Sequence, residues 1–201
     1  MPSSAVPTRF ALRSRILHWL MAAMILAMLF IGVSMVASLS WYHTLLAIHR
    51  PLGILVLIFA VIRIINRIFS TLPPFPPTMS QAERKIASAS EKLMYTLMIL
   101  MPLIGWGMLS AGSYPIVMWG PLHLPPILPA RPMLFAVLRE SHTILAYLFF
   151  LTFLAHFSAV MFHTFVIRDG LLNRMAIWPV HAAPAPAVSS PEPLVAGQEN
   201  N

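Results

Sequence analysis

Histidine is the side chain in this sequence with the widest chemical reach, because an imidazole can bind a metal ion or carry a proton. The sequence has eight histidines, six acidic residues and no cysteine. The lack of cysteine excludes disulfides, iron–sulfur clusters, thiolate zinc sites and covalent c-type haem attachment. Any metal cofactor is therefore expected to be held by histidine. The histidines in or beside long apolar stretches are His18, His49, His142 and His156.

The composition indicates the surroundings of these histidines. Of the 201 residues, 58% are hydrophobic and 9% are charged, whereas soluble domains have roughly 45–50% apolar and about 25% charged residues. This excludes an ordinary soluble protein and predicts one that spans a membrane. The net charge of +7 is then explained by basic residues that flank membrane segments. We expect membrane lipid as a partner, and no nucleic acid.

Four apolar stretches exceed the roughly 20 residues that a membrane crossing needs. They predict helices at about 16–39, 45–69, 83–111 and 133–167. The first is longer than the apolar core of a signal peptide, about 7–15 residues, so we expect it to be retained. The fold class is thus predicted to be all-α, a membrane-spanning four-helix bundle over residues 16–180. Residues 1–15 form a segment before it, and residues 181–201 are expected to be a disordered tail.

Proline and glycine mark the predicted helix boundaries. Pro51 suits the first turn of the second helix, where its missing N–H costs nothing. The proline-rich stretches 71–80 and 112–132 are predicted to be loops. Gly170 is placed to end the fourth helix.

Basic residues predict the orientation of the bundle. Four crossings place both termini on one side. Ten of the 13 Lys and Arg residues fall on that side: Arg9, Arg13, Arg15, Arg63, Arg67, Arg84, Lys85, Lys92, Arg168 and Arg174. Three fall on the other side: Arg50, Arg131 and Arg139. The positive-inside rule then makes both termini cytoplasmic in a multi-pass membrane protein.

The histidines fall at two depths of this bundle. His142 and His156 are fourteen residues apart on one predicted helix, which puts them on nearly one face and roughly 21 Å apart along its axis. His18 lies at the cytoplasmic start of the first helix, and His49 at the outer start of the second. Depth therefore pairs His18 with His156 near the cytoplasm, and His49 with His142 near the outer surface.

Facing histidines at two depths are what two non-covalent b-type haems require, since each iron takes two axial imidazoles and the macrocycle fills an apolar slot between helices. Gly53 would leave room for the flat ring. Arg50 and Arg139 would pair with haem propionates at the outer face. His163, seven residues after His156, would bond a propionate or line a quinone pocket.

Other chemistry is open to the same histidines. A single intramembrane histidine can bond a neighbouring helix, and histidines in series can relay protons, so a haem-free membrane scaffold or transporter is an alternative. Zinc or copper is disfavoured, because two ligands at each level are too few for a closed tetrahedral site.

Several strings resemble the bacterial cytochrome b561 family. They are ILHW around His18, IHRPLG around His49 with Arg63 and Arg67 following, LMYTLMILMPLIGWGMLSAG in the third predicted helix, and ESHTILAYLFFLTFLAH across His142 and His156. The resemblance runs from about Arg9 to Met175. It implies a four-helix inner-membrane protein in which these four histidines are the axial ligands of two b haems.

The resemblance also implies electron exchange with the quinone pool, including oxidation of superoxide at the outer face with ubiquinone as acceptor. The chain departs from the family pattern at Glu91, where members commonly carry a histidine four residues before the tyrosine that is here Tyr95. That position lies near the expected quinone site.

We therefore predict a di-haem b-type cytochrome, an oxidoreductase in the broad sense. Two axial histidines leave no open iron position, which favours outer-sphere electron transfer over oxygen activation. An anionic donor such as superoxide would be attracted by Arg50, Arg131 and Arg139. The alternative within redox chemistry is a cytochrome b subunit that exchanges electrons with a docked dehydrogenase or a periplasmic cytochrome.

Overall fold

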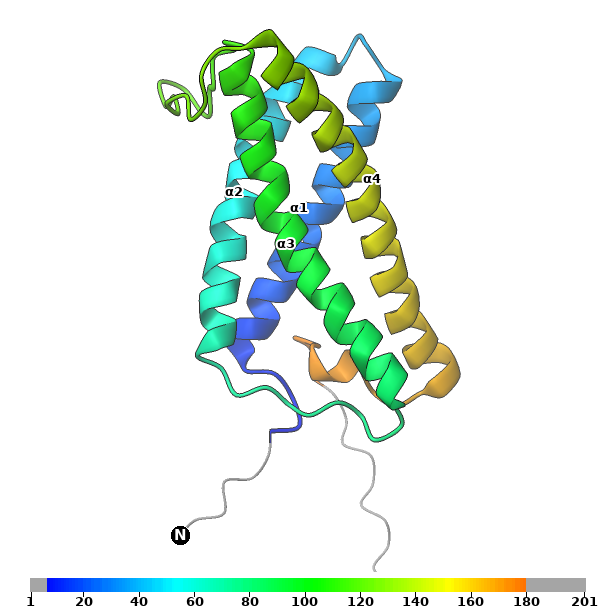
Figure 1. Cartoon of the computed structure of the whole chain (residues 1–201). Coiled ribbons are helices and arrows are strands. Elements are labelled where there is room, and N and C mark those ends of the chain that lie inside the picture. The colour runs from blue at the N-terminus through cyan, green and yellow to red at the C-terminus, as the bar shows by residue number, and fades with distance from the viewer. Residues whose placement is uncertain (1–6, 180–201) are drawn as a thin grey trace, which may run out of the picture.

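The computed structural model describes residues 7–179, which fold into a bundle of four long helices (Figure 1). Their bounds are α1 Leu12–Ala37, α2 Tyr42–Ile68, α3 Gln81–Ala111 and α4 Pro132–Phe162. A π-helical turn, His163–Ile167, continues α4, and a short 3-10 helix follows at Leu172–Arg174. The described residues contain no strand beyond one isolated bridge, between Val117 and His123. The predicted all-α class is confirmed.

All four helices are long and apolar enough to cross a membrane. Their outward side chains are large and apolar: Phe30 on α1 is 67% exposed, Ile68 on α2 72% and Leu151 on α4 59%. In water such a surface would be strongly unfavourable, whereas in a bilayer it faces lipid chains. The protein is therefore a multi-pass membrane protein.

The bundle has a small buried core halfway along its length. Its members come from all four helices: Met21, Ile25, Val56, Ala60, Leu97, Met98 and Phe149. Backbone packing is close between α1 and α2, between α2 and α3, and above all between α3 and α4. In contrast, α4 does not pack closely against α1 or α2. The bundle is thus tight along three helix pairs and wider where α4 faces α1 and α2.

The start of α3 follows a local capping rule. The Ser80 side chain accepts a hydrogen bond from the Glu83 amide at 3.2 Å, and the Glu83 carboxylate accepts one from the Ser80 amide at 2.6 Å. This capping box satisfies two donors that a helix start otherwise leaves free. The predicted loop before Ser80 therefore ends at a defined position.

Pro51 does not lie where the sequence predicts. It is inside α2, nine residues after Tyr42, and its side chain is fully buried. The prediction of a first-turn position is wrong, because the helix starts earlier than the apolar run does. Proline has no N–H to donate to the Ala47 carbonyl one turn earlier, and helices inside a membrane bundle tolerate this where neighbouring groups cover the break. His49 consequently lies well inside α2.

The fourth helix, with its π-helical turn, ends at Ile167 as the sequence predicts. Arg168, directly after the π-helical turn, adopts the left-handed backbone conformation with φ of 57°, and its amide donates to the His163 carbonyl at 2.7 Å. Gly170 is left-handed as well, with φ of 72°, but it lies two residues farther on. The chain therefore leaves the helix within the predicted Arg168–Gly170 stretch, but Arg168 and not Gly170 ends it.

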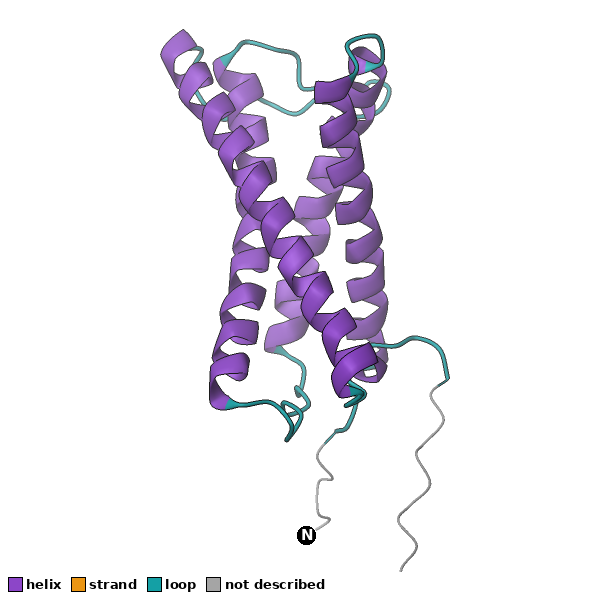
Figure 2. Ribbon diagram, turned by 90° about the vertical axis from the view of Figure 1, so that its right-hand side faces the viewer, coloured by secondary structure: helices purple, strands orange, loops and turns teal. Residues whose placement is uncertain are grey.

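Both ends of the described chain lie at the same end of the bundle (Figures 1 and 2). The Phe10 amide donates to the Arg174 carbonyl at 3.1 Å, and the Trp19 indole donates to the Met175 carbonyl at 2.9 Å. These bonds join the start of the chain to the segment after α4. The tail predicted to be disordered, 181–201, lies outside the described residues.

Candidate functional site

The structure brings the four intramembrane histidines together in two facing pairs. His18 of α1 faces His156 of α4 with ring centroids 6.5 Å apart, and His49 of α2 faces His142 of α4 at 6.3 Å. We call the first the terminal pair, because it lies towards the end of the bundle that holds both chain ends, and the second the distal pair. These are the two pairs predicted from the depth of each histidine in the bundle.

The ring separations suit one metal ion between each two imidazoles. With nitrogen–metal bonds of about 2 Å, two imidazoles on opposite sides of an ion have centroids roughly 6 Å apart. Both pairs match this value. No group of three or more His, Cys, Asp or Glu side chains that could hold a metal ion occurs among the described residues. Each pair could thus supply two ligands to one metal ion, and a macrocycle would have to supply the others.

Two further observations fit a macrocyclic cofactor. Nδ1 of His49 and Nδ1 of His142 are buried and make no hydrogen bond of good geometry, and buried polar atoms of this kind need a reason. A metal bound at Nε2 would hold each ring in place without a hydrogen bond at Nδ1. In addition, α4 stands away from α1 and α2, the two helices whose histidines face its own. The residues present therefore fit haem b.

The terminal pair has polar neighbours. Arg63 of α2 donates a hydrogen bond to His18 Nδ1 at 3.0 Å and another to the Tyr95 hydroxyl at 2.9 Å. Arg67, one turn later, forms an ion pair with Glu91 at 2.6 Å. A cavity of about 30 Å³ lies among these side chains, which is room for one or two water molecules.

Neither Arg63 nor Tyr95 receives a role from the sequence alone, although both belong to the stretches that carry the resemblance. One signal was available. Arg63 follows His49 by fourteen residues, the same spacing that separates His142 from His156. Fourteen residues lead from the distal depth to the terminal depth on nearly the same helix face. That spacing alone therefore places Arg63 at the level of His18.

The distal pair has a glycine against one ring. A Cβ added at Gly105 of α3 would lie 3.4 Å from His142 Cε1, so the absent side chain lets the imidazole approach the α3 backbone. At Gly53, the glycine proposed from sequence, a Cβ would lie 3.7 Å from the end of the Met28 side chain and near no histidine. The room that Gly53 leaves for a macrocycle stays a prediction.

The two arginines predicted to meet propionates lie near the distal pair's end of the bundle. Arg50 Nη1 donates to the Pro115 carbonyl at 3.3 Å, while its Nε is buried without a partner. Arg139 is exposed on the second turn of α4. Arg50 therefore has an unused donor beside His49, as a propionate contact requires. Both propionate contacts remain predictions.

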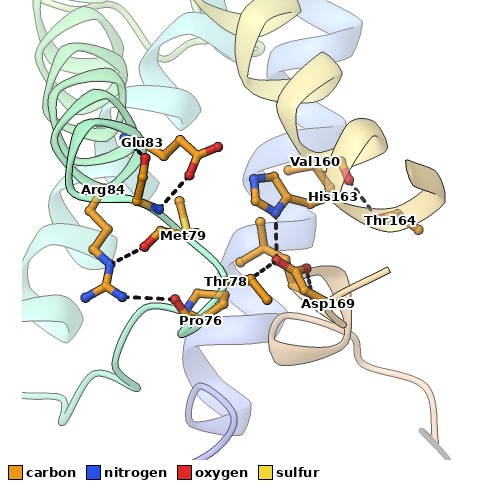
Figure 3. Close-up of polar contacts among 11 residues, drawn as sticks. Pro76, Thr78, Met79, Glu83, Arg84, Val160, His163, Thr164 and Asp169 are labelled. Carbon is orange, nitrogen blue, oxygen red and sulfur yellow. Dashed lines mark hydrogen bonds and ion pairs between the residues drawn. The ribbon is translucent and has the colours of Figure 1, made fainter. Parts of the chain in front are cut away.

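His163 lies at the other end of α4 and is 6% exposed (Figure 3). Its Nδ1 is 2.7 Å from an Asp169 oxygen, which also accepts from Thr78, and the other Asp169 oxygen accepts from the Leu171 amide, both at 3.0 Å. Burial acts to raise the pKa of Asp169, but the hydrogen bonds from His163, Leu171 and Thr78 outweigh it and hold that pKa below its usual value. His163 thus ties the end of α4 to the α2–α3 connection. Because Nδ1 is used in this way, only Nε2 of His163 could contact a propionate or a quinone, and that contact stays a prediction.

Comparison with known proteins agrees with this geometry. The family model for prokaryotic cytochrome b561 matches residues 9–177. "Cytochrome b561 homolog 2" of Escherichia coli K12 is 28% identical over 179 residues, covering 87% of this chain and 95% of the relative. "Probable superoxide oxidase CybB" of Yersinia pestis is 28% identical over 160 residues, covering 79% and 90%.

The match spans all four helices and both histidine pairs. Cytochromes of this family carry haem b and transport electrons in the membrane, which agrees with the donor set found here. The chain belongs to the prokaryotic cytochrome b561 family.

Proposed function

We propose that the chain holds two haem b groups, one between His18 and His156 and one between His49 and His142, and conducts electrons across the membrane. The observation that carries this proposal is the presence of two facing histidine pairs with nearly equal ring separations. One helix, α4, contributes to both pairs, and its two histidines are roughly 21 Å apart along the axis. When bound, each haem b supplies one-electron exchange without an open iron position.

The orientation follows from charge. Ten basic residues on the side of the termini against three on the other support a cytoplasmic location for both termini in the bacterial inner membrane. The terminal pair then lies towards the cytoplasm, and the distal pair towards the outer surface.

The proposed donor is superoxide at the outer surface, and the proposed acceptor is ubiquinone from the lipid. The printed name of the Yersinia pestis relative, a probable superoxide oxidase, supports the donor. Arg50, Arg131 and Arg139 would attract such an anion on that side. Two superoxide ions would each lose one electron and leave as dioxygen, while one quinone takes up both electrons and two protons to become the quinol.

The test begins with the purified protein in detergent. We expect a reduced-minus-oxidised spectrum with two resolvable b-type components and two haems per chain. Superoxide generated in solution should then reduce the protein, and added ubiquinone should reoxidise it. Absence of haem would favour the scaffold or transporter, whereas two haems that superoxide does not reduce would favour a subunit that docks a redox protein.

A further inference from the structure

Arg63 brings a permanent positive charge into contact with the terminal pair. Its guanidinium nitrogen lies 3.0 Å from His18 Nδ1. A metal bound at Nε2 would leave the proton on Nδ1, so in the haem-bound protein Arg63 would act on this ring through its charge and not as a donor to Nδ1. Arginine keeps its proton under all physiological conditions. The charge at this position is therefore fixed.

Tyr95 holds the guanidinium in place. Arg63 Nε donates to the Tyr95 hydroxyl at 2.9 Å, and the guanidinium carbon lies 5.6 Å from the centre of the tyrosine ring. A cation over an aromatic face is attracted by the ring as well as by the hydroxyl. Two contacts with one residue thus fix both the position and the direction of Arg63.

No carboxylate within residues 7–179 neutralises this arginine. The two ion pairs in that range are Arg67–Glu91 and His163–Asp169. Arg67 and Glu91 line the same small cavity as Arg63, but their opposite charges largely cancel at a distance. Arg63 is therefore the uncompensated charge that faces the terminal pair.

The distal pair lacks an equivalent contact. Arg50 follows His49 in the chain, but its Nη1 is directed to the Pro115 carbonyl. Nδ1 of His49 and of His142 makes no hydrogen bond of good geometry in the described structure. The two pairs thus share a ring geometry and differ in the charge that touches a ring.

We infer that Arg63 makes the terminal pair's haem the easier of the two to reduce and so directs electrons from the distal pair to the terminal pair. This inference rests on the proposed function. Reduction adds one electron and lowers the charge of the centre by one, which a nearby cation favours. No bond is made or broken in this step, and the electron lost at the distal centre is the electron gained at the terminal centre.

The test is a spectroelectrochemical titration of the purified holoprotein. Each centre is assigned first, with His142→Ala to isolate the terminal centre and His156→Ala to isolate the distal one. In the unsubstituted protein we expect the terminal centre to have the higher midpoint potential. Arg63→Gln should lower it, so that the equilibrium constant for an electron moving from the distal to the terminal centre falls by about tenfold.

Three further variants separate charge from structure. Arg63→Lys keeps the charge and should stay close to the unsubstituted potential. Tyr95→Phe keeps the aromatic face and should give a smaller decrease than Arg63→Gln. Lys85→Gln, which removes an exposed charge at the same end of the bundle, should leave the potential of the terminal centre unchanged. If Arg63→Gln does not retain its haem, the Arg63→Lys and Tyr95→Phe potentials decide.

Two results would overturn the inference. One is a terminal centre whose potential lies below that of the distal centre in the unsubstituted protein. The other is a terminal potential that is the same with arginine, lysine or glutamine at position 63. In either case the two haem spectra would still be present, so the proposed function would stand. A protein without haem spectra would refute both.

Discussion

The terminal pair and the distal pair present their rings in nearly the same way, with centroids 6.5 and 6.3 Å apart and planes inclined at 61° and 65°. Their neighbours differ. The terminal pair touches an arginine held by a tyrosine, and the distal pair touches a glycine and has two buried nitrogens without partners. Ring geometry follows from the helices that carry the histidines, whereas the electrostatic setting follows from whatever packs beside them. One bundle can therefore hold the same cofactor twice with unlike properties.

Removing one histidine tests whether the pairs are separate sites. We expect His142→Ala to reduce haem content from two towards one per chain, because an iron with a single imidazole loses an axial bond and its low-spin state. Haem quantification and the reduced-minus-oxidised spectrum measure this. His43→Ala, an exposed histidine on α2, is the control and should retain both haems. An unchanged spectrum in His142→Ala would show that His142 is not a ligand.

Filling the space at Gly105 tests what distinguishes the distal pair. A Cβ there reaches 3.4 Å from the His142 ring, so Gly105→Ala should be tolerated, whereas the extra methyl groups of Gly105→Val would overlap the imidazole. We expect Gly105→Val to lose or broaden the distal component of the spectrum and to keep the terminal one. Equal loss of both components would mean that the substitution disturbs the bundle as a whole.

Charge on the distal side tests the proposed donor. If arginines attract superoxide, reduction should slow as salt rises, because the Debye length falls from about 10 Å at 0.1 M to about 3 Å at 1 M. Arg50→Gln with Arg139→Gln should lower the rate severalfold and flatten its dependence on salt. Stopped-flow reduction of quinone-free protein measures both. Lys85→Gln with Lys92→Gln, at the opposite end, should change neither, and a rate indifferent to salt in the unsubstituted protein would remove superoxide as the donor.

The bond between His163 and Asp169 lies at the terminal end of the bundle. Of the changes considered, we expect its removal to have the smallest effect. Because the pKa of Asp169 is lower in the folded protein than its ordinary value, the charged carboxylate stabilises the fold above about pH 4, its unfolded pKa. That contribution is lost as the pH falls through the folded pKa. Asp169→Asn should lower the melting temperature by a few degrees at pH 7, and the difference should shrink in acid.

The same variant sharpens the comparison between the pairs. His156 lies on α4 seven residues before His163, so loosening the end of this helix should broaden the terminal haem component more than the distal one. Thermal unfolding and optical spectra measured on the same samples test this. A larger change in the distal component would mean that the bond does not act through α4.

Much of the fold was predictable because a membrane-spanning helix requires an apolar stretch of about 20 residues, which is easily recognised in a sequence. The four apolar runs predicted four helices, and the loops rich in proline lie between them as expected. Helix ends were harder. Pro51 was assigned to a first turn, since the apolar run begins near it, but the structure extends α2 back to Tyr42. Covered backbone inside a bundle permits a proline that an isolated helix would not.

The depth of each histidine was determined by the sequence itself, because a helix advances a fixed distance for each residue. The pairs His18–His156 and His49–His142 follow from that single dimension. Tertiary structure alone decided what lies around them: Arg63 and Tyr95 at His18, Gly105 at His142, and Asp169 at His163. These contacts depend on how each helix is rotated about its axis and which helix it faces. Packing between helices determines both the rotation and the neighbour, and the spacing of residues within one helix does not predict either.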